Sequence, residues 1–88
     1  LPIYANNLLN GVAEEADVIV ANILAEIILL LIPDAYRLLK PNGRFVVSGI
    51  IHDKVDEVLE AMYAEGFEVD QLFKQQDWYA IILKKAEE

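Results

Sequence analysis

The sequence has 88 residues, of which 56% are hydrophobic, and a formal net charge of −8, so it encodes at most one domain, with ample apolar material for a core. An acidic surface without a basic patch disfavours nucleic acids and anionic membranes as partners and suits a basic protein. Cysteine is absent, which excludes disulfides and thiolate metal sites and fits a cytoplasmic protein. The longest apolar run, 27–32, is far shorter than the roughly 20 residues of a membrane span, which excludes a transmembrane helix.

The first residues, 1–4, are apolar and are interrupted by Pro2. Residues 5–12 contain asparagines and a glycine, which are typical of turns and of the caps of short helices. We expect the end of a strand whose beginning is missing, followed by a turn.

Residues 17–23 predict a central strand. Four apolar residues, mostly β-branched, stand between Asp17 and Asn22 without alternation, as in a parallel strand that is covered on both faces. A helical pattern follows, so Asn22 falls at the carboxyl end of the strand, where open α/β sheets bind ligands. Asn22 is therefore the first candidate for a functional residue.

The apolar residues after Asn22 repeat at helical spacing but also occupy other positions, which predicts a helix buried on more than one side. Pro33 removes one backbone hydrogen bond, so we expect a kink there or a second segment that begins near Asp34. Residues 40–43, Lys-Pro-Asn-Gly, predict the turn that ends this helix.

Residues 44–51 predict a second buried strand, which ends in the small pair Ser48 and Gly49. The next helix ends at Gly66. Its apolar stripe, which must lie on the sheet, consists of Val55, Val58, Leu59, Met62 and Tyr63.

The last part of the chain predicts an antiparallel pair of strands. Residues 67–73 alternate imperfectly, as in an edge strand, residues 78–83 are apolar on both faces, and residues 74–77 connect them. The two helices provide right-handed crossovers between parallel strands, and the hairpin adds an antiparallel element to the same sheet. We therefore predict one α/β domain over residues 1–88.

Five short segments resemble, in order, those of one enzyme family. They are 16–24 (ADVIVANIL), 38–44 (LLKPNGR), 48–51 (SGII), 64–67 (AEGF) and 77–78 (DW), the last followed by an apolar strand. The series is similar to the bacterial methyltransferases of ribosomal protein L-eleven, which are class I S-adenosylmethionine-dependent enzymes. The resemblance runs through nearly all of the chain and implies the C-terminal half of a Rossmann-like methyltransferase sheet.

The resemblance also implies that part of the enzyme is missing. The family holds its cofactor mainly on a glycine-rich loop after the first strand and on an acidic residue after the second. Neither is in this sequence, and Gly11, Gly43, Gly49 and Gly66 stand too far apart to form such a loop. We expect a fragment that lacks the N-terminal half, is inactive alone, and binds S-adenosylmethionine no more tightly than millimolar.

The resemblance gives Asn22 the catalytic role and a contact with the cofactor. Its side-chain oxygen would accept hydrogen bonds from the target amine and aim the amine's lone pair at the methyl carbon. The alternative interpretation is an N-cap for the following helix, a position that asparagine favours. We favour catalysis, although both roles are compatible.

Four further residues match family positions. Asn7, with the backbone amide of Leu8, corresponds to the adenine site, although an asparagine that holds a turn explains Asn7 equally well. Ser48 and Gly49 correspond to a loop that leaves room for the substrate, although Gly49 also suits a sharp bend.

Two aromatic side chains receive no functional role. His52 is the sole histidine and has no companion ligands, so neither acid–base catalysis nor a metal site is expected there. Trp78 matches a family position, but a large aromatic residue at the start of a strand more often packs than recognises a ligand.

Two hypotheses of function follow. In the first, the chain is part of an enzyme that methylates lysine and N-terminal amines of a ribosomal protein. In the second, it is a non-catalytic structural or engineered scaffold module. With the first strand of the fold missing, residues 17–22 would present a free edge, which predicts a homo-oligomer joined there or a packing in which residues 1–4 fill the gap.

Overall fold

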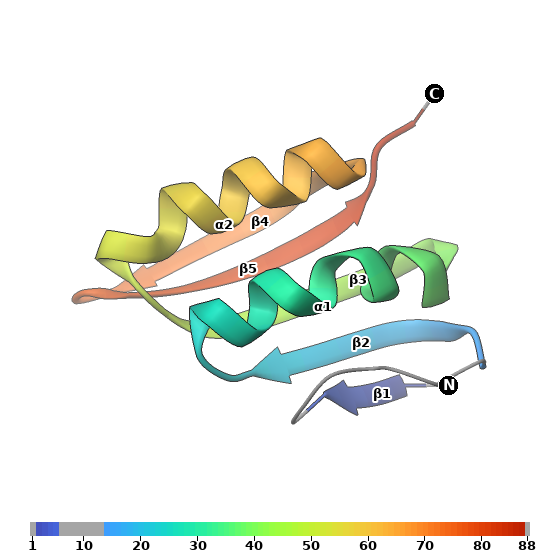
Figure 1. Cartoon of the computed structure of the whole chain (residues 1–88), viewed down its shortest axis with the longest axis horizontal. Coiled ribbons are helices and arrows are strands. Elements are labelled where there is room, and N and C mark those ends of the chain that lie inside the picture. Colours follow the sequence, from blue (N-terminus) through green and yellow to red (C-terminus); the bar gives the residue numbers. More distant parts are fainter. Residues whose placement is uncertain (1, 6–13, 88) are drawn as a thin grey trace.

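The computed structural model describes residues 2–5 and 14–87. Its elements, in chain order, are β1 (Pro2–Ala5), β2 (Ala16–Asn22), α1 (Ala25–Leu38), β3 (Leu39–Ile51), α2 (His52–Glu65), β4 (Phe67–Gln75) and β5 (Trp78–Lys85) (Figure 1). The strands form one sheet in the order β1-β2-β3-β5-β4. β1, β2 and β3 are parallel, and β5 runs antiparallel between β3 and β4. The predicted fold class, with its antiparallel C-terminal hairpin, is confirmed.

β1 occupies the side of β2 that was expected to be free. Its four residues pair in parallel with residues 18–21, so β2 lies between two strands, as a central strand does. Of the two expected arrangements, the structure shows the one in which the N-terminal residues fill the gap. A homo-oligomer joined through that edge of β2 is therefore not supported, because β1 already occupies the edge.

Both helices lie on one face of the sheet. α1 lies over β2 and β3, α2 lies over the hairpin side, and the two helices contact each other (Figure 1). Beneath them are two rows of fully buried cross-strand neighbours, Ile19–Phe45–Leu83 and Ala21–Val47–Ile81. No described helix covers the opposite face, where the row Val20–Val46–Ile82 remains partly exposed. The prediction that β2 is covered on both faces is therefore wrong for this chain.

α1 is a single helix that continues through Pro33. Its buried residues form one stripe: Ala25, Ile28, Leu31, Ile32, Ala35 and Leu38. Leu30, on the other side, is 61% exposed, and Pro33 is also exposed. The backbone hydrogen bond that proline removes is thus lost on the side that faces water, where it is least costly. Both the divided helix and the burial on more than one side were wrong predictions.

The predicted turn at 40–43 is a bulge within β3. Leu39 pairs with Ala16 and Arg44 pairs with Val18, so the residues between them bulge out of the ladder. The guanidinium of Arg44 closes this bulge, because its Nη1 donates to the carbonyl oxygens of Asn42 and Gly43 at 3.2 and 3.0 Å. The strand therefore begins earlier than residue 44.

α2 ends where the sequence predicts. Gly66 has a left-handed φ of 114° and its amide donates to the last turn of the helix, which is the usual way for glycine to end one. Of the predicted stripe, Tyr63 is not in the core, because its side chain is 54% exposed. In the parts of the chain that the structure describes, no helix is long and apolar enough to cross a membrane.

The C-terminal hairpin is tighter than predicted. β4 continues to Gln75 and β5 begins at Trp78, so only Gln76 and Asp77 connect them. Gln76 has a φ of 56°, a backbone conformation that two-residue hairpin turns require. Among the described strands, β4 pairs with β5 alone, so it is the edge strand that its sequence pattern predicts.

Candidate functional site

Asn22, the last residue of β2, lies beside Ser48, which is three residues before the end of β3. These two residues are the last partners in the parallel ladder between the strands. The Asn22 side chain is exposed, and Gly49 follows Ser48 directly. The structure thus gathers three of the predicted site residues at the edge of the sheet where open α/β folds bind ligands.

Asn22 does not cap the helix that follows it. α1 begins at Ala25, its N-cap is Leu24, and no side chain hydrogen-bonds to its first turn. Among the described residues, no hydrogen bond to the Asn22 carboxamide is found either. The N-cap interpretation is therefore wrong.

Gly49 makes a close approach to Asn22. It has a left-handed φ of 75°, and a β-carbon built on it would lie 2.7 Å from Asn22 Oδ1. The alternative interpretation, that Gly49 allows a sharp bend, agrees with its left-handed backbone conformation. The same residue also leaves the space that the carboxamide occupies.

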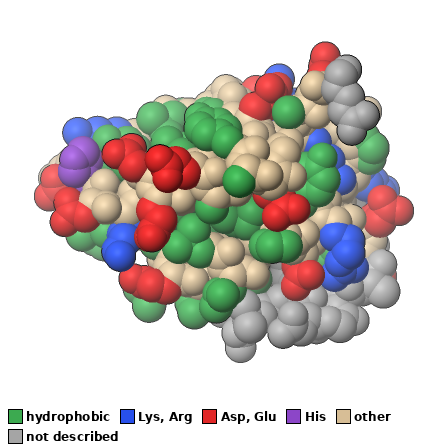
Figure 2. All heavy atoms as spheres, turned by 45° about the horizontal axis from the view of Figure 1, so that its top comes forward, with side chains coloured by type: hydrophobic (Ala, Val, Ile, Leu, Met, Phe, Trp, Pro, Cys, Tyr) green, Lys and Arg blue, Asp and Glu red, His purple; other side chains and the backbone are tan. Residues whose placement is uncertain are grey.

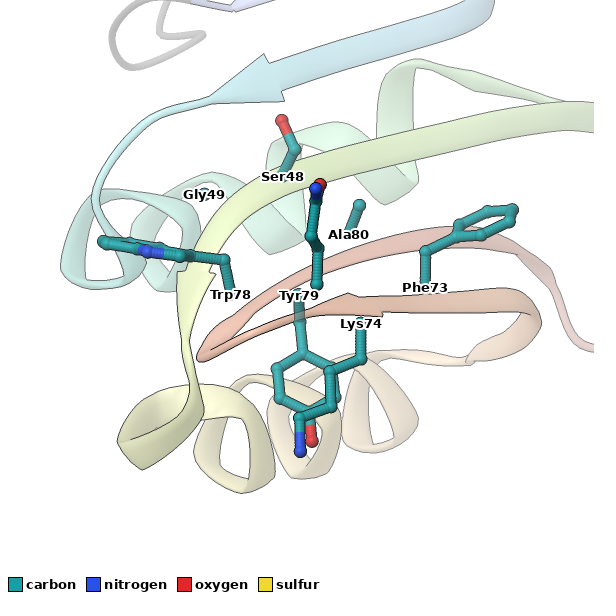
Figure 3. Close-up of a pocket in the computed structure, with 8 residues that line it drawn as sticks. Ser48, Gly49, Phe73, Lys74, Trp78, Tyr79 and Ala80 are labelled. Atoms are coloured by element: carbon teal, nitrogen blue, oxygen red, sulfur yellow. The ribbon is translucent and has the colours of Figure 1, made fainter.

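An open pocket of ≈ 390 Å³ lies beside this pair (Figure 3). Ser48 and Gly49 form its β3 wall. The other lining residues come from the end of β4 and the start of β5: Phe73, Lys74, Gln75, Trp78, Tyr79 and Ala80. Its volume is within the range of small-molecule sites, and its lining combines three aromatic side chains with three polar ones.

The hairpin residues approach the pocket from both faces of the sheet. Phe73 pairs with Ala80, and Lys74 pairs with Tyr79. In Figure 3 the side chains of Lys74 and Tyr79 point to one side of the hairpin and those of Phe73 and Ala80 to the other. Lys74 Nζ lies 5.8 Å from the centroid of the Tyr79 ring, close enough for a cation–π contact.

Trp78 is a wall of the pocket and not a core residue. Its side chain is 52% exposed, and that of Phe73 is 51% exposed. The expectation that Trp78 packs rather than recognises a ligand stays a prediction, and the two-residue turn places its half-exposed ring at the tip of the hairpin, in the lining of the pocket. Sequence reasoning also missed Phe73 and Tyr79. The signal for them was the alternation of side chains between the two faces of the hairpin, but this alternation can be assigned only when the length of the turn is known.

His52 connects the first turn of α2 to the hairpin. Its backbone amide donates to the Asp77 carbonyl at 2.7 Å. Its ring lies beside that of Tyr79, with Nδ1 3.4 Å from the phenol oxygen. Within the described ranges, no group of three His, Cys, Asp or Glu side chains could hold a metal ion.

The described residues do not fit S-adenosylmethionine as a whole. Where the ladder between β2 and β3 ends, the paired residues supply the amide of Asn22 and the hydroxyl of Ser48. None of the pocket-lining residues is acidic, so the lining offers no carboxylate for ribose hydroxyls. The predicted adenine-site residues, Asn7 and Leu8, lie outside the described residues.

The surface of the helix-bearing side is acidic. Figure 2 shows Asp and Glu side chains scattered over this side among fewer basic ones. α2 alone carries five of them, Asp53, Asp56, Glu57, Glu60 and Glu65. This distribution agrees with the net charge of −8 and favours approach by a basic molecule.

Sequence comparison relates residues 2–86 to the family model of ribosomal protein L11 methyltransferase (PrmA). The ribosomal protein L11 methyltransferase of Enterococcus faecalis is 65% identical over 86 residues, which are 98% of this chain and 27% of that protein. The protein of the same name from Streptococcus pyogenes is 50% identical with the same coverage. The chain thus spans 27% of the length of these curated relatives.

Solved structures give the same result. Ribosomal protein L11 methylase from Lactobacillus delbrueckii superposes with a TM-score of 0.88 at 32% identity, covering 92% of this chain and 42% of that one. A methyltransferase from Pyrococcus furiosus superposes with a TM-score of 0.72 at 23% identity, covering 90% and 46%, a likeness that concerns the fold alone. The sheet is therefore part of a Rossmann-like methyltransferase fold.

Proposed function

This chain belongs to the ribosomal protein L11 methyltransferase family, and from that premise we propose that it forms the C-terminal part of a catalytic methyltransferase domain. The whole enzyme transfers methyl groups from S-adenosylmethionine to lysine and N-terminal amines of a ribosomal protein in the cytoplasm. In this proposal the present residues form the substrate side of the active site. The aromatic pocket receives the amine-bearing side chain, and Asn22 orients the amine.

The observation that carries the proposal is the position of the Asn22 carboxamide, which is exposed at the strand end and lies against Gly49, a wall of the pocket. An amide oxygen accepts hydrogen bonds from an amine, and two such bonds leave the lone pair pointing in a fixed direction. A carboxylate in this place would raise the pKa of the amine and favour its unreactive protonated form. A neutral amide orients the amine without that effect.

The pocket suits a side chain that is apolar along its length and polar at its end. Phe73 and Trp78 present half-exposed rings, which pack well against the methylene groups of a lysine. Ser48, at the β3 wall, adds a hydroxyl to the lining of the pocket. Occupation of the pocket would remove water from the neighbourhood of the amine and strengthen its hydrogen bonds to Asn22.

The cofactor supplies the methyl group when it is bound, but the described residues do not form a complete site for it. Its glycines are dispersed, and the residues that line the pocket include no carboxylate. We therefore propose that the chain alone is inactive. The negative charge of the chain supports a basic ribosomal protein as partner, because complementary charge speeds encounter. Self-association through β2 is not part of the proposal, since β1 pairs along that side.

Steady-state methyl transfer by the intact enzyme that contains this sequence tests the role of Asn22. Asn22→Ala should lower kcat by about 100-fold, the size of effect that loss of orientation produces. The matched control is Asn42→Ala, which removes an exposed asparagine side chain from the bulge of β3. Wild-type kcat in Asn22→Ala would overturn the proposal, as would an equal loss in the control.

A further inference from the structure

Gly49 lies in a β-bulge at the edge of the pocket. Between Val47 and Ile50, β3 contains one residue more than β5 does between their partners, Ile81 and Tyr79. Gly49 takes up the extra length with its left-handed φ of 75°. Bulges of this kind bend a strand and change the direction of neighbouring side chains, and they are frequent beside functional sites.

Among the described residues, one side chain fills the space beside Gly49. A β-carbon there would lie 2.7 Å from Oδ1 and 4.0 Å from Cγ of Asn22, and no other atom of residues 2–5 and 14–87 lies within 4 Å outside the adjoining residues. Real β-carbons do not approach an oxygen so closely. Within the described part of the chain, a side chain at position 49 would therefore meet the carboxamide of Asn22 first.

Two other glycines show why this arrangement is specific. A β-carbon on Gly43 would meet a backbone oxygen, that of Asp17, at 2.7 Å, so a side chain there would disturb the sheet itself. A β-carbon on Gly66 would meet the ring of Tyr36 at 3.0 Å, far from the pocket. At Gly49 the obstructing atom is the free end of a side chain, which can rotate away without moving the backbone.

From this contact we infer that Gly49 is a positioning residue for Asn22. The absence of a β-carbon lets Oδ1 rest against Gly49, which itself lines the pocket. Among the described residues no hydrogen bond fixes the carboxamide, so this contact with Gly49 limits its rotation on one side. A methyl group at 49 displaces the carboxamide from the direction in which it receives the amine. The consequence of this contact for catalysis rests on the proposed function of Asn22.

NMR of the 88-residue chain tests the contact without any assay of activity. In Gly49→Ala the side-chain amide signals of Asn22 should shift, and nuclear Overhauser contacts between its NH₂ group and residue 49 should change. The control is Gly66→Ala, which places alanine at a similarly positive φ of 114° and should leave the Asn22 amide unchanged. Unchanged Asn22 signals in Gly49→Ala would overturn the inference and leave the proposed function standing.

A double-mutant cycle keeps the test decisive if Gly49→Ala folds poorly. Replacing Asn22 by alanine removes the obstructing oxygen, so Gly49→Ala should lower Tm less in the Asn22→Ala background than in the native one. Equal losses of Tm in the two backgrounds would show that only backbone strain is involved and would overturn the inference. Wild-type methyl transfer by Asn22→Ala would contradict the catalytic role of Asn22, but the coupling between residues 22 and 49 could still be measured.

Discussion

The imidazole of His52 stacks on the phenol ring of Tyr79, with centroids 5.9 Å apart and planes inclined by 25°. His52 is the first residue of α2 and Tyr79 is the second residue of β5. Tyr79 also lines the pocket, so the pair joins the helix start to one wall of the proposed site. A residue without an assigned chemical role thus supports the shape of the pocket.

His52→Ala should lower the free energy of unfolding by about 1 kcal/mol, because an aromatic contact of this type contributes about 0.5–1.5 kcal/mol. Tyr79→Phe keeps the stacking and loses only a long, exposed hydroxyl contact, so its loss should be about 0.5 kcal/mol or less. Urea denaturation measures both. Tyr63→Phe, on the exposed side of α2, is the control. If His52→Ala has the same effect with and without Tyr79→Ala, the two rings are not coupled.

The most destabilising single truncation should be Phe45→Ala. Phe45 is 0% exposed beneath both helices, and its ring centroid lies 5.6 Å from that of Phe67. Truncation of a buried phenylalanine costs about 3–5 kcal/mol, a large part of the stability of a domain of this size. Leu30→Ala, on the exposed side of α1, should change stability by about 0.5 kcal/mol or less. Similar urea midpoints for the two variants would contradict the described core.

The predictable part of this fold is the part that periodicity governs. The strand over residues 17–22, the stripe of α2 and its end at Gly66 follow from local patterns that burial and backbone freedom impose. The exposure of Leu30 could not be predicted from the sequence, because the identity of an apolar residue does not show whether another element covers it. The bulge at 40–43 was recognised as a turn, but not as part of a strand, since pairing depends on distant residues.

The candidate site was predictable only on its β2 and β3 side. Local sequence marks Asn22 at the end of β2 and the small pair Ser48 and Gly49 near the end of β3, and the structure brings them together. The aromatic wall was missed because the hairpin register depends on the length of its turn. Because residues 74–77 were predicted to form the turn, the pairing of Phe73 with Ala80 could not be predicted from the sequence.

Hydrogen exchange should show whether β1 holds its place on β2. The parallel pairing with Pro2–Ala5 shields backbone groups of residues 18–21 from water, so their amides should exchange slowly in the native chain. Deletion of residues 1–5 should speed exchange there or, because a free apolar edge recruits another strand, produce dimers visible by light scattering. The amides of Ile81 and Leu83, in the interior of the sheet, are the control. Rapid exchange at 18–21 in a monomeric native chain would exclude the β1 pairing.

Isothermal titration should detect no binding of S-adenosylmethionine to the 88-residue chain tighter than millimolar. The cofactor is charged and polar, and affinity for it requires fixed polar partners that the described residues do not supply. The intact enzyme serves as the positive control under the same conditions. Micromolar affinity of the isolated chain would show that its own residues hold the cofactor, and the assignment of the binding groups to other parts of the enzyme would be wrong.

Trp78→Ala separates a recognition role from a packing role. Trp78 is 52% exposed, so its removal should lower the free energy of unfolding by about 1 kcal/mol or less, far below the effect of a buried aromatic residue. In methyl transfer by the intact enzyme, the variant should raise KM for the protein substrate and leave KM for S-adenosylmethionine unchanged, because the ring lines the substrate pocket. Tyr63→Ala is the matched control, since Tyr63 is 54% exposed but lies on α2 away from the pocket lining. A large loss of stability in Trp78→Ala with unchanged kinetics would restore the packing interpretation.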